Sequence, residues 1–393
     1  MSLPTDITVA VRKSLFYIVL LTLVFISFSR QDNTTADIAM ALPFFVVLYF
    51  LFFSLDRPAV SNWLRNRLQG NIRWITLFPL LLIVLFYSYL ALNSVNPFKG
   101  TVFLVPYLLF FPVLAYAARD NNKPQIDWFD FVVFFLYFFP VTLVKLDSSG
   151  NLPFHGGGFD SVYRIAVMLS AIFAFSVVRD LKDIGAYPVF RRKFLFTVLW
   201  VWVVFYIFVF VIGYSVRFIR PGELPGWDMS RVELVLRKIL SIFLHTALFE
   251  ELVFRGLLQN MLGKRIKQAA SWKSFWIWGL AILLVFSLLA GYALKGSMQW
   301  FPALITLLLF AAAWFLEKAG KQGMGVYTAL AITSVIFGLV HFHSGSIIFT
   351  GLAGIGGWAY GYVYLKTKNI FYVALLHALV NASPLILGLE LAK

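Results

Sequence analysis

Long apolar runs separated by short polar connections constrain the fold of this chain more than any other feature. A helix needs about 20 residues to cross a hydrocarbon core of about 30 Å, and most of the runs are long enough. Hydrophobic residues make up 61% of the chain and charged residues 13%, which is too little polar surface for a water-soluble domain. The sequence therefore predicts an all-α, polytopic transmembrane helical bundle. We expect thirteen spans, near residues 14–29, 38–55, 74–92, 101–118, 128–144, 161–178, 194–216, 238–262, 274–294, 299–316, 325–341, 346–365 and 370–388.

The basic residues are distributed unevenly between alternate connections. The net charge is +15, and Lys and Arg concentrate in connections such as 57–73, 191–193 and 264–267. Cytoplasmic loops of membrane proteins carry such an excess, so we expect the N-terminus in the cytoplasm. The expected partner of this basic rim is the lipid bilayer, not nucleic acid. The sequence shows no organelle-targeting feature, which favours a bacterial inner membrane.

Cysteine is absent from the chain, and this narrows the chemistry open to it. Disulfide bonds, thiolate metal sites, a catalytic thiol and palmitoylation are all excluded.

Residues 1–192 and 193–393 differ in where their polar residues lie. In the first region, which we expect to hold six spans, charged residues lie almost wholly in the connections. Arg164 is an exception, and we expect its side chain to extend to the membrane interface. In the second region ionisable residues occur inside the apolar runs, where they are costly and mark functional sites. We therefore predict a catalytic domain at 193–393 and an N-terminal membrane region of unknown role.

The first group of such residues is Glu250-Glu251-Leu252-Val253-Phe254-Arg255, inside the run at 238–262. On an α-helix, Glu251 and Arg255 share a face and can form an ion pair. That ion pair could support a catalytic site, or it could join two helices. Glu250 points about 100° away from it. Without that cationic partner its carboxylate can serve as a general base, so Glu250 is a candidate catalytic residue.

Two further pairs of residues lie four positions apart in the last third of the chain. Phe337 and His341 end the run at 325–341, so the phenyl ring can pack on the imidazole and limit its rotation. His377 and Asn381 lie in the run at 370–388 and can both donate hydrogen bonds to an oxyanion. Asn381 would equally suit a hydrogen bond between helices. His343 has the placement of an interface residue.

Taken together and in this order, the three patterns resemble the CPBP family, the CAAX-protease and bacteriocin-processing (Abi) membrane proteins. The family signatures are Glu-Glu-x-x-x-Arg, Phe-x-x-x-His and His-x-x-x-Asn, and the resemblance covers about residues 195–393. It implies an intramembrane endopeptidase of the glutamic type that acts on a membrane-associated protein or peptide. By similarity, Glu250 and His341 activate a water molecule, and His377 and Asn381 stabilise the oxyanion. The supporting residues would be Glu251, Arg255 and Phe337.

The spacing between the first two motifs and the possible metal ligands both bear on this resemblance. About 80 residues separate Arg255 from Phe337, more than the compact family pattern, so we predict a two-helix insert near 274–316. Glutamate and histidine side chains can also ligate zinc. The resemblance favours a mechanism without metal or other cofactor, and zinc stays open as the alternative.

Two other classes of function are compatible with a bundle of this size. A carrier or a polysaccharide-handling protein would place functional polar residues in the first 192 residues, where almost none occur. A non-catalytic scaffold of the same fold would not need Glu250, His341, His377 and Asn381. The sequence therefore favours the peptidase.

Overall fold

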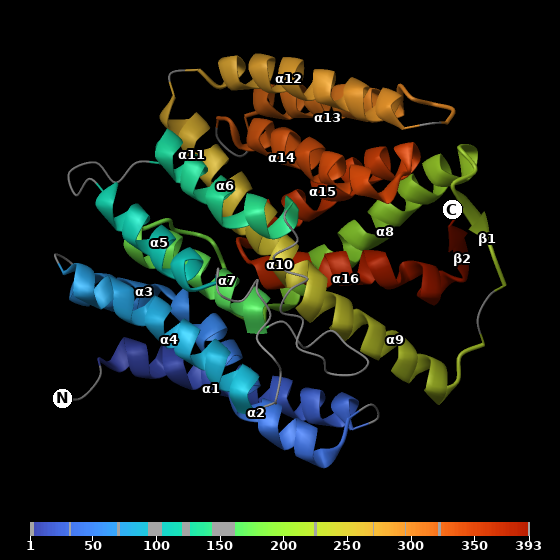
Figure 1. Ribbon diagram of the computed structural model, residues 1–393. Coiled ribbons are helices and arrows are strands. Elements are labelled where there is room, and N and C mark those ends of the chain that lie inside the picture. Colours follow the sequence, from blue (N-terminus) through green and yellow to red (C-terminus); the bar gives the residue numbers. More distant parts are fainter. Residues whose placement is uncertain are drawn as a thin grey trace. The chain divides into compact units, whose positions relative to one another are not determined.

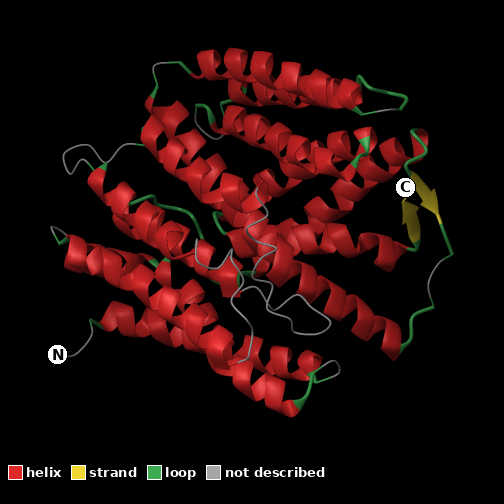
Figure 2. Ribbon diagram, in the orientation of Figure 1, coloured by secondary structure: helices red, strands yellow, loops and turns green. Residues whose placement is uncertain are grey.

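The protein is almost entirely helical in its computed structural model (Figures 1 and 2). The structure describes residues 4–30, 33–68, 71–92, 104–119, 126–143, 162–223, 226–269, 271–294, 296–320 and 324–391. The first helices are α1 (Thr5–Ser29), α2 (Thr35–Leu55), α3 (Pro58–Leu68), α4 (Ile72–Leu92), α5 (Leu104–Ala117), α6 (Trp128–Leu143) and α7 (Val162–Ile172), and a π-helical turn η3 (Phe173–Val178) extends α7. The next elements are α8 (Arg192–Ser215), strand β1 (Ile219–Pro221), and the helical segment of α9 (Met229–Ile242), η4 (Phe243–Ala247), α10 (Leu248–Glu251), η5 (Leu252–Gln259) and α11 (Asn260–Gln268). The last are α12 (Trp272–Ala293), α13 (Phe301–Lys318), α14 (Val326–Val340), the 3₁₀ turn η6 (His341–Ser344), α15 (Ile347–Thr367), α16 (Ile370–Leu387) and strand β2 (Leu389–Leu391).

Eight of the described helices are long and apolar enough to cross a membrane. They are Thr5–Phe28, Thr35–Leu55, Ile72–Leu92, Arg192–Ser215, Trp272–Ala293, Phe301–Lys318, Val326–Ser344 and Ile370–Leu387, and three shorter apolar helices accompany them, Leu104–Ala117, Trp128–Phe138 and Tyr163–Val178. The predicted fold class, an all-α membrane bundle, is therefore confirmed. The number of spans and the side of the N-terminus stay predictions.

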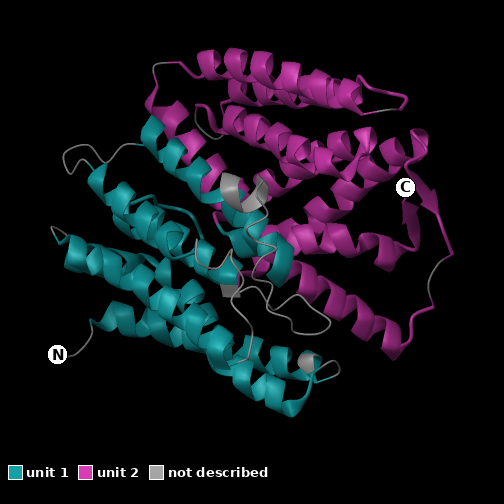
Figure 3. Cartoon of the chain, in the orientation of Figure 1, with its two compact units in different colours: residues 1–189, 244–253, 369–371 teal, residues 190–243, 254–368, 372–393 magenta. Residues whose placement is uncertain are grey.

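Two compact units make up the chain (Figure 3). Unit 1 consists of Met1–Val189, Leu244–Val253 and Asn369–Phe371, and unit 2 of Phe190–Phe243, Phe254–Lys368 and Tyr372–Lys393. The division into domains at residue 192 that the sequence predicts stays a prediction.

In unit 1, buried polar contacts tie the connection after η3 to the ends of earlier helices. The Asp56 carboxylate accepts hydrogen bonds from the Ser176 hydroxyl at 2.6 Å and from the backbone N–H of Ala186 at 2.9 Å. Burial raises the pKa of Asp56 to about 6, although these hydrogen bonds offset part of the effect. Arg179 forms a bidentate ion pair with Asp130, with N–O distances of 2.6 and 2.8 Å. These contacts fix the non-helical segment after η3 against helices of unit 1 and give several of its buried polar groups partners.

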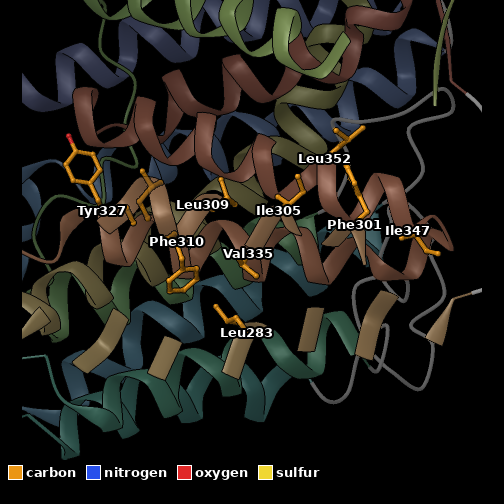
Figure 4. Packing of buried hydrophobic residues seen from close by; sticks show 12 residues of the cluster. Leu283, Phe301, Ile305, Leu309, Phe310, Tyr327, Val335, Ile347 and Leu352 are labelled. Atoms are coloured by element: carbon orange, nitrogen blue, oxygen red, sulfur yellow. The ribbon is translucent and has the colours of Figure 1, made fainter. Parts of the chain in front are cut away.

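In unit 2, the α12–α13 hairpin packs directly against the helices of the second motif (Figure 4). The sequence predicts this hairpin as an insert. Its side chains share one hydrophobic cluster with α14 and α15, made of Leu283, Phe301, Ile305, Leu309, Phe310, Ala313, Tyr327, Leu330, Ala331, Val335, Ile347 and Leu352. The hairpin therefore forms part of the core that holds α14 in place.

A carboxylate from α13 caps the N-terminus of α14. Glu317 is buried, and its two oxygens accept hydrogen bonds from the backbone N–H groups of Gly325 at 2.9 Å and Thr328 at 2.8 Å. A negative charge there satisfies free N–H groups and interacts favourably with the helix dipole. The start of the helix that carries Phe337 and His341 is thereby fixed.

A short antiparallel pair of strands joins two distant parts of unit 2. Arg220 of β1 lies opposite Glu390 of β2, and the backbone N–H of Gly222 donates to the carbonyl of Gly388 at 2.8 Å. The pairing brings the end of α8 next to the end of α16. Both ends therefore lie on one side of the bundle, as expected for two spans that run in the same direction.

Candidate active site

The helical segment that carries the first motif is not a regular α-helix. Glu250 and Glu251 lie in the four-residue α-helix α10, between the π-helical stretches η4 and η5. The sequence predicts a regular α-helix here, with about 100° between neighbouring side chains. In π-helical stretches hydrogen bonds span five residues instead of four, and such stretches are frequent at functional sites. The wider turns change the directions of the side chains on either side of the glutamates.

The two glutamates belong to unit 1. Glu251 is fully buried, whereas Glu250 is partly exposed. The Glu250 Oε2 atom is itself buried and accepts no hydrogen bond from the residues that the structure describes. A buried carboxylate oxygen of this kind is costly in a folded protein and is typical of a group that meets a ligand or a water molecule. The geometry of Glu250 toward the histidines of unit 2 stays a prediction.

Arg255 lies in unit 2 and is almost fully buried. Its Nη2 atom donates a hydrogen bond to the carbonyl of Gly357 at 3.1 Å. Its guanidinium lies over the ring of Phe337, 4.4 Å from the centroid, and over that of Tyr360 at 5.2 Å. One turn further, the side-chain amide of Gln259 donates to the carbonyl of Gly361 at 3.2 Å. Arg255 of the first motif and Gln259 beyond it are thus attached to two backbone carbonyls of α15.

Within unit 2, Phe337 contacts one residue from each of the three motifs. Its ring packs on the His341 imidazole with a centroid distance of 4.7 Å, as the spacing predicted. The same ring lies edge-on to His377 at 6.0 Å, and the Arg255 guanidinium covers it. One aromatic side chain therefore contacts the arginine of the first motif and the histidines of the second and third.

The hydrogen bond of His341 determines which of its nitrogens carries the proton. Nδ1 lies 2.7 Å from the carbonyl oxygen of Phe337. Because a carbonyl only accepts, the hydrogen of the neutral ring is on Nδ1, and the lone pair is on Nε2. The imidazole is half-buried at the end of α14, so Nε2 is a suitable acceptor for a water molecule. His343 makes the same type of bond to Val340 and is exposed, in keeping with an interface residue.

His377 is buried and stacks on Tyr360, with ring centroids 4.7 Å apart and planes inclined by 12°. Asn381 lies one turn further along α16 and is exposed. Between them and the end of the helix, Pro384 lacks an N–H, which leaves the carbonyl of Val380 without its helical donor. The Tyr206 hydroxyl of α8 donates to that carbonyl at 2.9 Å. Helix α8 thereby holds the part of α16 that carries the third motif.

Residues 233–321 and 309–383 match a family model described as type II CAAX prenyl endopeptidase, Rce1-like. The matched ranges contain all three motifs, from Glu250 to Asn381. This part of the chain is similar to that family. The match confirms the suspected resemblance to the CPBP family, and it indicates a CAAX-type intramembrane protease. No curated protein and no solved structure matches the chain.

Sequence reasoning missed the contribution of α15 to the Rce1-like region. Tyr360, Gly357 and Gly361 lie between the second and third motifs, in a helix that carries no charged residue near them. At Gly357 an added Cβ would lie 2.9 Å from the backbone of Ser334, so this position needs glycine for the close approach of α14 and α15. At Gly361 it would meet the side chain of Leu330. The run of glycines in this helix was the available signal.

A metal site receives no support from side chains grouped within either unit. Among the described residues of each unit, no three or more His, Asp or Glu side chains lie close enough to hold an ion. The effect of a chelator on cleavage therefore tests the zinc alternative.

Proposed function

We propose that the protein is a glutamic intramembrane endopeptidase that hydrolyses a peptide bond of a membrane-associated protein or peptide. The observation that carries the proposal is the packing around Phe337, which brings together Arg255, His341 and His377 of three separate motifs. The match of residues 233–383 to the Rce1-like family model supports the peptidase class. The expected location is a bacterial inner membrane.

In this proposal, Glu250 and His341 activate a water molecule. The Glu250 carboxylate takes one proton, while His341 Nε2 accepts a hydrogen bond from the same water and orients it. The resulting hydroxide adds to the carbonyl carbon of the substrate, and the electron pair of the C=O bond moves to oxygen. The product of this step is a tetrahedral oxyanion.

Donors on α16 then stabilise the negative charge. His377 and Asn381 lie one helical turn apart, so both can donate to the same oxyanion. When the intermediate collapses, the C–N bond breaks, and Glu250 passes its proton to the leaving nitrogen. Arg255, Glu251 and Phe337 support the site and do not react.

The proposal is tested by comparing membranes that carry the wild-type protein or Glu250→Gln. This substitution keeps the shape of the side chain and removes the base. Mass spectrometry of the new protein termini in each membrane proteome measures the cleavage. We expect termini that appear with the wild type, persist with chelator present, and vanish with Glu250→Gln in folded protein.

Glu233→Gln is the matched control, because Glu233 lies in α9 of the same helical segment but outside the motif. It should leave the termini unchanged. Identical termini in the wild type and Glu250→Gln would contradict the proposal and favour a carrier or a scaffold. Loss of cleavage with chelator would favour the zinc mechanism.

A further inference from the structure

The stretch that carries the two glutamates belongs to the compact unit of the N-terminal region. Leu244–Val253 lies in unit 1 together with residues 1–189, whereas the residues before and after it in the same helical segment belong to unit 2. Within this stretch Leu244, Ala247 and Leu248 are buried. The N-terminal region lies outside the residues that match the family, so the family gives it no role.

Arg164 of α7 makes a direct contact with this stretch. Its Nη1 atom donates a hydrogen bond of 2.6 Å to the backbone carbonyl of His245, in the π-helical turn η4. A hydrogen bond from a charged donor is shorter and stronger than one between neutral groups. The sequence favours an arginine that extends to the membrane interface, and that placement stays a prediction. The structure adds that the guanidinium holds a backbone turn.

Aromatic contacts from the same region fix the residue next to Glu250. The Arg164 guanidinium lies over the ring of Phe249, 5.2 Å from its centroid. The ring of Phe138 in α6 meets Phe249 edge-on, with centroids 6.0 Å apart. Phe249 is buried and immediately precedes Glu250. Two helices of the N-terminal region therefore hold both the turn before Glu250 and its neighbour.

We propose that the N-terminal region positions the general base, and that Arg164 is the positioning residue through which it does so. The inference rests on the proposed role of Glu250. A π-helical turn can convert to a regular α-helical turn, which would rotate every side chain that follows it. The hydrogen bond to the His245 carbonyl and the contacts to Phe249 favour the π-helical form. Arg164 thus sets the direction of the Glu250 carboxylate without contacting the substrate.

The test measures kcat and KM of the full-length protein on a quenched-fluorescent peptide. The peptide spans the cleavage site mapped with the Glu250→Gln comparison. Arg164→Leu should lower kcat by about tenfold or more and leave KM unchanged, because a misdirected base slows the chemical step alone. Arg164→Lys keeps one charged donor and should recover part of the loss. Equal losses for Leu and Lys would contradict a role of the hydrogen bond.

Arg57→Leu is the matched control for loss of stability. Arg57 also lies in unit 1 and also donates to backbone carbonyls, those of Phe53 and Pro188. It should lower the melting temperature and leave kcat of the folded protein unchanged. If Arg164→Leu does not fold, Phe249→Leu serves as a second variant, with the same expected fall in kcat.

The outcomes separate this inference from the proposed function. In the Glu250→Gln background, Arg164→Leu should cause no further loss, since both act through the same carboxylate. Wild-type kcat in Arg164→Leu and Phe249→Leu, with Glu250→Gln inactive, would overturn the positioning role and leave the protease intact. Wild-type turnover in Glu250→Gln would instead refute the proposed base.

Discussion

At the level of single residues, two aromatic rings hold the His377 imidazole in place. Tyr360 stacks on one face of the imidazole, and Phe337 meets it edge-on. The Arg255 guanidinium covers both of these rings. A donor to an oxyanion is effective only when its direction is set before the reaction. In the proposed mechanism, Tyr360 would therefore support catalysis through the orientation of His377.

We expect Tyr360→Leu to lower kcat by up to about 10²-fold, because loss of the stacked ring frees the imidazole to rotate. Tyr360→Phe keeps the ring and should retain most of the activity. Tyr364→Leu is the control, since Tyr364 is equally buried one turn further along α15. Each Leu variant should lower stability similarly, as measured by thermal unfolding. Equal kcat in the two Leu variants would contradict the role of the Tyr360 ring.

At the level of elements, α14 and α15 depend on features outside the motifs. Gly357 of α15 allows the close approach of the two helices, and its carbonyl accepts a hydrogen bond from Arg255 of the first motif. The carbonyl of Gly361 accepts one from Gln259. Glu317 of α13 caps α14 through two backbone N–H groups. The predicted insert therefore supplies both core packing and a helix cap to α14, which carries Phe337.

We expect Glu317→Ala to lower the free energy of unfolding by about 2 kcal/mol, because two buried N–H groups lose a charged acceptor. Glu317→Gln keeps one acceptor oxygen and should lower the free energy of unfolding by less. Chemical or thermal unfolding in detergent measures both changes. Lys318→Ala alters the neighbouring exposed residue and should change stability by less than about 0.5 kcal/mol. A loss as large in Lys318→Ala would show that the cap is not the cause.

At the level of the whole molecule, the distribution of basic residues predicts how the chain is oriented in the membrane. The pairing of β1 with β2 requires the segments after α8 and α16 to lie on one side. The positive-inside bias predicts that this side is the external one. Because the chain contains no cysteine, single introduced cysteines report their own side without background.

We expect a membrane-impermeant maleimide to label Met229→Cys in intact cells and Lys193→Cys only after lysis. Both positions are exposed, and they lie in connections that the sequence places on opposite sides. The cysteine-free wild type controls for background labelling. The opposite pattern would place the N-terminus outside and reverse the predicted orientation.

The sequence by itself determined the all-α membrane class and the three motifs, because these depend on local properties. Apolar runs encode spans through their length, and a spacing of four places two side chains on one helix face. The contact between Phe337 and His341 followed from that spacing alone.

Only the tertiary structure decided how the motifs are supported. The π-helical turns around Glu250, the carbonyls that receive Arg255 and Gln259, and the ring of Tyr360 against His377 depend on other helices. The contact of Arg164 with His245 joins residues 81 positions apart in the chain. Hydrogen bonds and packing between such distant residues depend on the path of the backbone, which no local pattern of residue types specifies.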